Sequence, residues 1–325
     1  MKPFESFLAS KLEDYIAYRK ILGYTDKSLK YQLIHLDRAV REKKADWDSL
    51  KPSFFLDLRE KIKKEPRTVN EIIGGVRGFF QFLVRAGDLE KNPVQDIPPL
   101  QQKAYIPFIF SPDETERLLA AIEGRMRKVP DHFLKDLTLY LTIVLLARCG
   151  LRISEPTRLL LIHYRPQEGT IYIEKTKFKK DRLLPVPQNV IAQIDNYLAL
   201  RSSLLDEDQN PYLLWAGEQR KVPRREIYSV FHQAVKDIGL NEPRRAMENI
   251  TFGSPIPHSL RHSFAINTLK HIKEKGNSPR YALPILSAYM GHCKYRYTAL
   301  YLKVLDAEHR KGLVDFTLIK ESGNR

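Results

Sequence analysis

Residues 159–187 read LLLIHYRPQEGTIYIEKTKFKKDRLLPVP, and this stretch decides the fold class because it interrupts the helical spacing on either side of it. Three short apolar runs, at 159–164, 170–175 and 182–186, are typical of β-strands. Gly169 predicts the turn between the first two runs, and a cluster of lysines predicts the turn between the last two. The stretch therefore predicts a small three-stranded antiparallel sheet within a chain that is otherwise mainly α.

Helical spacing dominates the remainder of the second half of the chain. The apolar run 137–147 is too short to span a membrane and predicts a buried helix. Five further segments predict helices on the same spacing: 188–200, 224–238, 260–273, 281–290 and 298–304. The stretch 241–257 is loop-like and supports no assignment.

The first part of the chain, residues 4–90, predicts a small helical domain. Gly23 is expected to end the first helix, and Thr25 or Asp26 to cap the second. Prolines at 93, 98, 99 and 107 follow, and proline removes the backbone donors that regular structure needs. Ser111 and Glu114 then have the spacing of a capping box at the start of a new helix. We therefore expect a helical domain at 1–91, a linker at 92–110 and a second domain at 111–325.

The composition indicates a folded protein with a polyanionic partner. The chain has 325 residues, of which 43% are hydrophobic, and its net charge is +15. A folded chain this basic favours nucleic acid over a membrane surface, because no basic amphipathic helix with an aromatic face is evident. Its two cysteines cannot build a disulfide framework, and its start lacks the apolar core of a secretory signal. We expect a cytoplasmic protein, with both cysteines as ordinary reduced thiols.

Five residues have the chemistry needed to attack a phosphodiester without a metal. Arg152 and Arg261 could bind one phosphate through bidentate hydrogen bonds, which lysine cannot do equally well. His258 and His292 could move protons or donate hydrogen bonds. Tyr301 could supply a phenolic nucleophile. Taken singly, each has an ordinary structural explanation: a salt bridge, a polar helix start or a core aromatic.

A metal site is the alternative reading of the same region. His258 and His262 have a spacing that suits zinc ligation from one helix, and His292 and Cys293 could complete such a site. That reading leaves the arginines and the tyrosine unexplained. No trio of acidic residues lies near these motifs, so two-metal catalysis is not favoured, and we expect neither a metal nor another cofactor.

In this order and spacing the residues resemble the tyrosine recombinases, the integrase family of site-specific DNA recombinases. The chain has the family's series in sequence: Arg152, Lys177, His258, Arg261, His292 and Tyr301. The resemblance covers essentially the whole chain. It implies a helical, SAM-like core-binding domain, a linker, and a mixed α/β catalytic domain with a small three-stranded sheet.

The resemblance also implies the role of each residue. Arg152 and Arg261 would clamp the scissile phosphate, while His258 and His292 would assist proton transfer and stabilise the transition state. Tyr301 would form a 3′-phosphotyrosyl link and release a 5′-hydroxyl. Such a link conserves the phosphodiester energy, so rejoining needs no nucleotide cofactor.

Two further roles follow from the resemblance. Glu155 would orient the site, and Lys177, in a β-hairpin, would protonate the leaving oxygen. The family's hairpin usually has glycines around its lysine, and this one has none, so Lys175 or Lys179 could be the working residue instead.

The expected partner is double-stranded DNA, bound mainly through phosphates. The candidate contacts are basic residues near the motifs and on the first domain: Arg67, Arg77, Lys175, Lys179, Lys180, Arg244 and Arg245. The resemblance implies a homotetramer on two DNA sites, a monomer or weak dimer when free, nucleoid association, and possible accessory DNA-bending proteins. A type IB-like topoisomerase and a catalytically inactive DNA-binding regulator are the alternatives. Strand exchange between two DNAs would distinguish a recombinase from a topoisomerase, and a covalent adduct would distinguish both enzymes from a regulator.

Overall fold

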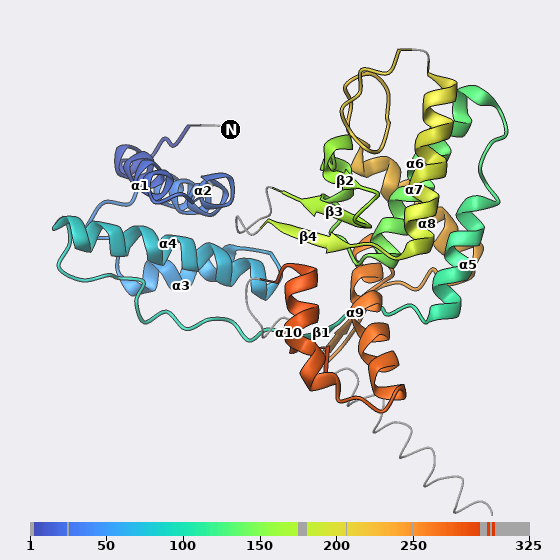
Figure 1. Cartoon of the computed structure of the whole chain (residues 1–325). Helices are drawn as coiled ribbons and strands as arrows, with labels where there is room; N and C mark the ends of the chain where they lie inside the picture. Colours follow the sequence, from blue (N-terminus) through green and yellow to red (C-terminus); the bar gives the residue numbers. More distant parts are fainter. Residues whose placement is uncertain are drawn as a thin grey trace, which may run out of the picture. The chain divides into compact units, whose positions relative to one another are not determined.

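A computed structural model describes residues 3–24, 26–174, 181–205, 207–248, 250–292, 298–299 and 301–302. The chain forms two compact units that divide between Ala104 and Tyr105 (Figure 1). The division falls inside the range 92–110 that the sequence predicts to be a linker. The domain boundaries themselves remain a prediction.

The first unit is helical, as expected. Its helices are α1 (Ala9–Ile21), α2 (Asp26–Glu42), α3 (Pro52–Lys61) and α4 (Pro66–Ala86). Proline begins both α3 and α4, where its missing N–H costs no hydrogen bond. The apolar stripe of α4 is buried, and its ring Phe80 packs edge-on against Phe55 of α3 at 5.1 Å. At the end of α4, Gly87 adopts φ +82°, the left-handed conformation that commonly ends helices.

The segment after α4 packs on its own unit. Arg77 of α4 donates hydrogen bonds to the carbonyls of Val94 (3.0 Å) and Ile97 (2.7 Å). Asn70 both donates to and accepts from the backbone of Leu100, at 2.8 Å in each case. Val94 and Ile97 are themselves buried in the core of this unit. Side chains of α4 therefore hold the backbone of the first half of the predicted linker.

The second unit is built around a buried helix, α6 (Pro130–Arg148), as the apolar run 137–147 predicts. Four helices contact α6: α5 (Pro112–Glu123), α7 (Gln188–Leu204), α8 (Arg224–Asp237) and α9 (Pro257–Glu274). A further helix, α10 (Pro279–Met290), packs on α9. The predicted capping box is confirmed: Glu114 donates its N–H to Ser111 Oγ (3.1 Å), and Ser111 donates its N–H to Glu114 Oε2 (2.7 Å).

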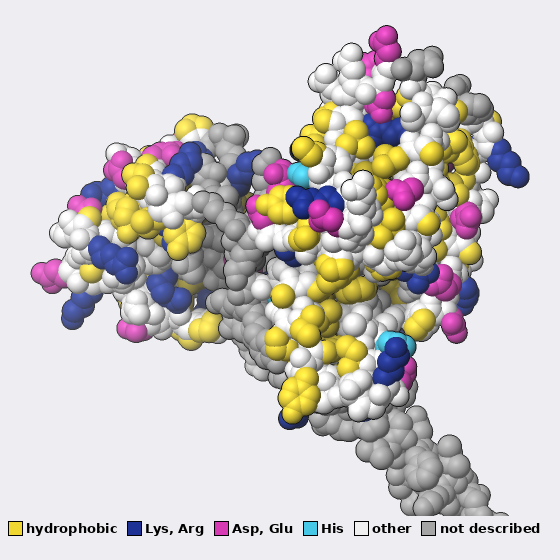
Figure 2. All heavy atoms as spheres, in the orientation of Figure 1, with side chains coloured by type: hydrophobic (Ala, Val, Ile, Leu, Met, Phe, Trp, Pro, Cys, Tyr) yellow, Lys and Arg dark blue, Asp and Glu magenta, His cyan; other side chains and the backbone are white. Residues whose placement is uncertain are grey.

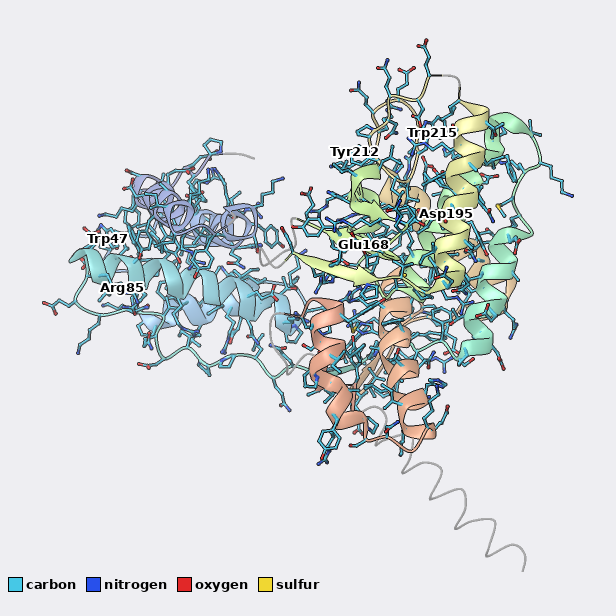
Figure 3. The ribbon with its side chains drawn as sticks, viewed as in Figure 1. Trp47, Arg85, Glu168, Asp195, Tyr212 and Trp215 are labelled. Carbon is cyan, nitrogen blue, oxygen red and sulfur yellow. The ribbon has the colours of Figure 1, made fainter. Side chains whose placement is uncertain are left out.

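The predicted sheet is present, which confirms the fold class. Strands β2 (Tyr164–Arg165), β3 (Thr170–Ile173) and β4 (Arg182–Pro185) pair antiparallel in that order. The sheet is fixed to α7 by a 2.7 Å hydrogen bond from the Tyr164 hydroxyl to Asp195, which is labelled in Figure 3.

The first strand is shorter than predicted. The sequence predicts a strand at 159–164. In the structure, residues Leu161–His163 form a 3₁₀ turn and strand β2 begins only at Tyr164. The reason is a competing partner for the backbone. Leu161 donates its N–H to Pro211, and Leu213 donates its N–H to Leu159, so these residues bond to the 211–213 loop instead of to β3.

A second small sheet was not predicted. Strands β1 (Ala104–Ile106), β5 (Arg245–Met247) and β6 (Ile250–Phe252) form it in the order β1-β6-β5. Part of the loop-like stretch 241–257 is therefore a hairpin. Its residues are largely exposed on both faces, so no alternation of apolar and polar residues marks them as strands.

The surface mixes charges of both signs. Figure 2 shows basic and acidic side chains interspersed over the visible face of each unit. None of the helices within the described ranges has the length and hydropathy of a membrane-spanning helix.

Candidate active site

Glu155 is the carboxylate at the centre of the site, in the turn that follows α6. It is 8% exposed, and it accepts hydrogen bonds from the Arg152 backbone N–H and from Arg152 Nη1, both at 2.9 Å. Arg182 donates to its two oxygens at 3.1 and 3.0 Å. Burial alone would raise the pKa of Glu155, but the hydrogen bonds and charge of Arg182 outweigh it and lower that pKa. Glu155 is therefore ionised, and it holds two arginines in place.

Arg182, at the start of β4, joins three parts of the second unit. Beyond Glu155, its Nε donates to the Tyr289 carbonyl at 2.8 Å, near the end of α10. Gly291 follows with φ +63°, and a Cβ there would lie 3.0 Å from Arg182 Nη1. The sequence predicts a strand at 182–186 but gives Arg182 no role in the site. A charged residue opening the apolar run of β4 was the one available signal.

Arg261, in the first turns of α9, is the most deeply buried member of the site at 1% exposure. Its Nη1 donates to the Gly150 carbonyl at 2.6 Å, and its Nη2 donates to the Met290 carbonyl. Arg152 Nη2 donates to the next carbonyl, that of Gly291, at 2.7 Å. Burial and the charge of Arg152 lower the pKa of Arg261 to about 9, so it stays protonated at neutral pH. The turn at 290–291 thus brings the two predicted arginines together.

Three histidines, hereafter the site histidines, surround this pair: His258, His262 and His292. The rings of His258 and His262 meet edge-on with centroids 4.7 Å apart. His292 Nδ1 lies 2.8 Å from Thr298 Oγ1. Burial, followed by neighbouring positive charges and histidines, lowers the pKa of His262 and of His292 to about 3.

His258 differs because its side chain is exposed. Partial desolvation by its neighbours, followed by the charges of Arg261 and Arg152, lowers its pKa to about 4. All three site histidines are neutral at pH 7.

Tyr301 is buried beside the histidines, at 4% exposure. Its hydroxyl lies 3.0 Å from His262 Nδ1, and its ring packs in the cluster formed with α9 and α10. Burial raises the pKa of Tyr301, although the charges of Arg261 and Arg152 oppose that rise. Tyr289 is another tyrosine of this region, but its hydroxyl donates to the Pro185 carbonyl at 3.2 Å and its ring stacks on Phe264.

The predicted lysines cannot be compared with this geometry. Lys175, Lys177, Lys179 and Lys180 lie outside the described residues, as do Cys293, Tyr295 and Tyr297. Of the strands on either side of these lysines, Ile173 of β3 pairs with Arg182 of β4.

The predicted DNA-binding arginines are spread over the two units. Arg67 is exposed and pairs with Glu71 at 3.3 Å. Arg77 instead directs its side chain to the 94–97 backbone, so part of its donor capacity is already used within the fold. Arg244 and Arg245 are exposed, the second within β5. Contact with DNA remains a prediction for all four.

The site is arranged to bind an anion. Arg152, Arg182 and Arg261 bring three positive charges to one buried region, and Glu155 supplies one negative charge. Arginines held in this way present fixed donors to a phosphate and lose little rotamer freedom when it binds. A neutral histidine can accept a proton, and a buried phenol beside it can give one up.

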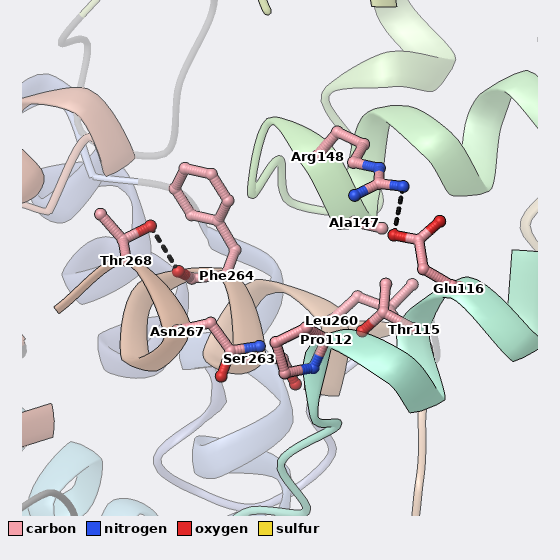
Figure 4. A pocket seen from close by; sticks show the side chains of 10 residues that line it. All are labelled: Pro112, Thr115, Glu116, Ala147, Arg148, Leu260, Ser263, Phe264, Asn267 and Thr268. Carbon is pink, nitrogen blue, oxygen red and sulfur yellow. Dashed lines mark hydrogen bonds and ion pairs between the residues drawn. The ribbon is translucent and has the colours of Figure 1, made fainter. Parts of the chain in front are cut away.

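Other features of this region lie outside that arrangement. A pocket of about 220 Å³ lies between α5, α6 and α9, and its α9 residues include Ser263 and Asn267 (Figure 4). By helical spacing these residues face away from His258 and His262. Among the described residues, no three His, Cys, Asp or Glu side chains are grouped to hold a metal ion. Burial raises the pKa of Cys149 to about 12, which makes its thiol inert at neutral pH.

Known proteins are similar to this chain in sequence and fold. The model of the phage integrase family matches residues 109–308. Tyrosine recombinase XerA of Pyrococcus furiosus is 25% identical over 304 residues, which cover 94% of this chain and 92% of XerA. The XerH site-specific recombinase in a post-cleavage complex with its difH substrate aligns with a TM-score of 0.66 at 16% identity, over 94% of this chain and 83% of that one. A lambda integrase tetramer bound to a Holliday junction aligns with a TM-score of 0.61 at 16% identity, over 88% and 77%. With the family's fold present and its model matching more than half of the residues, this chain belongs to the phage integrase family and is a tyrosine recombinase, an enzyme of the DNA strand-transferase class.

Proposed function

We propose that this enzyme is a site-specific recombinase that cleaves and rejoins double-stranded DNA through a 3′-phosphotyrosyl link to Tyr301. The observation that carries the proposal is the buried Tyr301 hydroxyl beside His262, within reach of the charges of Arg261 and Arg152. A phenol held among fixed cations can be directed at a phosphorus atom whose oxygens those cations bind.

The arginines supply the electrostatic part of the reaction. A phosphodiester gains negative charge on its non-bridging oxygens as it is attacked, and Arg152 and Arg261 are fixed by backbone carbonyls before DNA arrives. Preorganised donors of this kind are worth roughly 10²–10³ in rate each. His258 and His292 would donate further hydrogen bonds to the same oxygens, and Lys177 would protonate the leaving 5′-oxygen.

Strand exchange follows from two such cleavages on paired sites. A tetramer in which each duplex carries two subunits would pass the freed 5′-hydroxyls between duplexes and form a Holliday junction. The lambda integrase tetramer described above supports this assembly for the present chain. The free protein would be a monomer or weak dimer, with any accessory DNA-bending protein acting at the synapse.

Trapping the covalent intermediate tests the proposal. Wild type, Tyr301→Phe and Tyr289→Phe would be incubated without metal with nicked duplex fragments of the source genome, and SDS-stable protein–DNA adducts would be recovered. We expect adducts with wild type and Tyr289→Phe and none with Tyr301→Phe. Tyr289→Phe is the matched control, because it makes the same chemical change at a hydroxyl that donates to the Pro185 carbonyl instead of contacting a site histidine.

Each outcome separates one function from another. Wild-type protein that binds DNA without forming an adduct would overturn the proposal in favour of a DNA-binding regulator. An adduct without strand exchange between two duplexes carrying the captured site would favour a type IB-like topoisomerase. An adduct with exchange, lost in Tyr301→Phe, supports recombination through Tyr301.

A further inference from the structure

We infer that His262, rather than His258, is the catalytic residue that takes the proton from Tyr301 during cleavage and returns it during rejoining. This inference rests on the proposed function, since it requires Tyr301 to be the nucleophile. The family resemblance assigns proton transfer to His258 and His292 and gives His262 no role.

Geometry is the first support. The Tyr301 hydroxyl lies 3.0 Å from His262 Nδ1, within the range expected of a general base and its substrate proton. His258 contacts the ring of His262, and the ring of His292 lies 6.4 Å from that of Tyr301. The ring of His262 lies nearer to that of Tyr301, at 5.8 Å, and its Nδ1 is within hydrogen-bonding distance of the phenol oxygen.

The surroundings of the pair also suit proton transfer. Tyr301 is buried in the cluster of α9 and α10, so bulk water has little access to its hydroxyl. With Nδ1 accepting, the neutral ring of His262 must hold its proton on Nε2. The charged and titratable groups facing His262 are His258 and Arg261 on α9, His292 after α10, and Tyr301 itself.

These neighbours keep His262 unprotonated in the free enzyme, so Nδ1 is available to accept. A bound phosphodiester brings negative charge beside Arg152 and Arg261 and so raises the proton affinity of the nearby imidazole. The base therefore strengthens when substrate is present. This is the order of events that attack by a phenol requires.

The step balances as follows. The Tyr301 O–H bond breaks as the bond from Oη to phosphorus forms, and the proton moves to His262 Nδ1. The bond from phosphorus to the 5′-oxygen breaks, and that oxygen takes a proton from the general acid proposed to be Lys177. In rejoining, the 5′-hydroxyl attacks phosphorus and gives its proton to Lys177, while the bond from phosphorus to Tyr301 Oη breaks and Tyr301 recovers its proton from His262.

The test compares adduct formation by wild type, His262→Asn and His271→Asn on a nicked duplex of the captured site. We expect the single-turnover rate of His262→Asn to fall by about 10²–10⁴, the range for general-base catalysis. His271→Asn is the matched control, since His271 is an exposed histidine on the same helix and should leave the rate at the wild-type level. An unchanged rate in His262→Asn, while wild type forms the adduct, would overturn the inference and leave the proposed function intact.

Two bypass measurements separate a base from a residue that only supports the fold. Replacing Tyr301 with 3,5-difluorotyrosine, a more acidic phenol, should restore much of the rate lost in His262→Asn, because an ionised nucleophile needs no base. A substrate with a 5′-bridging sulfur at the scissile phosphate, whose leaving group needs no acid, should rescue Lys177→Ala and not His262→Asn. Rescue of His262→Asn by the sulfur substrate, or its failure to respond to the acidic phenol, would refute the assignment. Absence of an adduct from wild type would instead refute the proposed function.

Discussion

Replacing Arg182 with methionine should strongly destabilise the second unit while keeping most of the side-chain volume. The substitution removes two hydrogen bonds to the Glu155 carboxylate and one to the Tyr289 carbonyl. Both partners of the ion pair are at least nine-tenths buried, so Glu155 would lose a charge partner that solvent cannot replace. Removing one partner of a buried pair costs about 3–5 kcal/mol. Glu155 retains Arg152, so we expect about 3 kcal/mol, at the lower end of that range.

Fluorescence can assign this loss to the correct unit. The chain has two tryptophans, Trp47 in the first unit and Trp215 in the second. Urea unfolding followed in a Trp47→Phe background therefore reports on the second unit through Trp215. Adding Glu155→Gln to Arg182→Met should recover about 1–3 kcal/mol, because a neutral amide then replaces the buried carboxylate that has lost Arg182 and keeps only Arg152. A loss below about 1 kcal/mol for Arg182→Met, or an equal loss with and without Glu155→Gln, would refute the role assigned to this ion pair.

Three further perturbations have defined outcomes. The site histidines have pKa values near 6.5 in the unfolded chain and lower values in the folded chain, so the unfolded chain binds more protons. The urea concentration at the unfolding midpoint should therefore decrease as the pH is lowered from about 7 to about 5; a constant midpoint would contradict this. Gly150→Ala would place a Cβ 2.5 Å from Phe264 at φ +57°, whereas Gly276→Ala has a similar left-handed φ and open space around the new Cβ. Gly150→Ala should therefore lower the free energy of unfolding by about 1–3 kcal/mol more than Gly276→Ala does, and equal losses would contradict the packing argument. Arg77→Met should speed amide exchange across residues 92–100 while α4 stays protected, and unchanged exchange would show that the two carbonyl contacts are dispensable.

Local patterns in the sequence predicted the fold well where residues close in sequence determine the local structure by themselves. The Ser111 capping box and the buried run 137–147 needed only their own residues, and both are present. The stretch 159–163 was wrongly predicted as strand because a loop fifty residues later competes for its backbone. The hairpin of β5 and β6 was missed because its exposed residues have no alternation.

The site divides in the same way. Spacing selected Arg152, Arg261 and Tyr301, and the structure gathers them near the turn at 290–291. Spacing did not identify Arg182 as a site residue, because its hydrogen-bond partners lie in two segments that are distant from it in sequence. Nor could it find the carbonyls that hold the arginines, because every residue has a carbonyl and its orientation has no sequence signature.

The hydrogen bonds that hold the arginines have a consequence for when this enzyme becomes active. They join residues 107 to 139 positions apart: Arg182 to Tyr289, Arg261 to Gly150 and Arg152 to Gly291. Contacts this distant in sequence form late, because each must close a long loop before it returns any stability. Tyr301, the proposed nucleophile, comes later still in the chain. Under the proposed function, a polypeptide that is still being synthesised has no complete site until Tyr301 has left the ribosome, and a product truncated before Tyr301 has none.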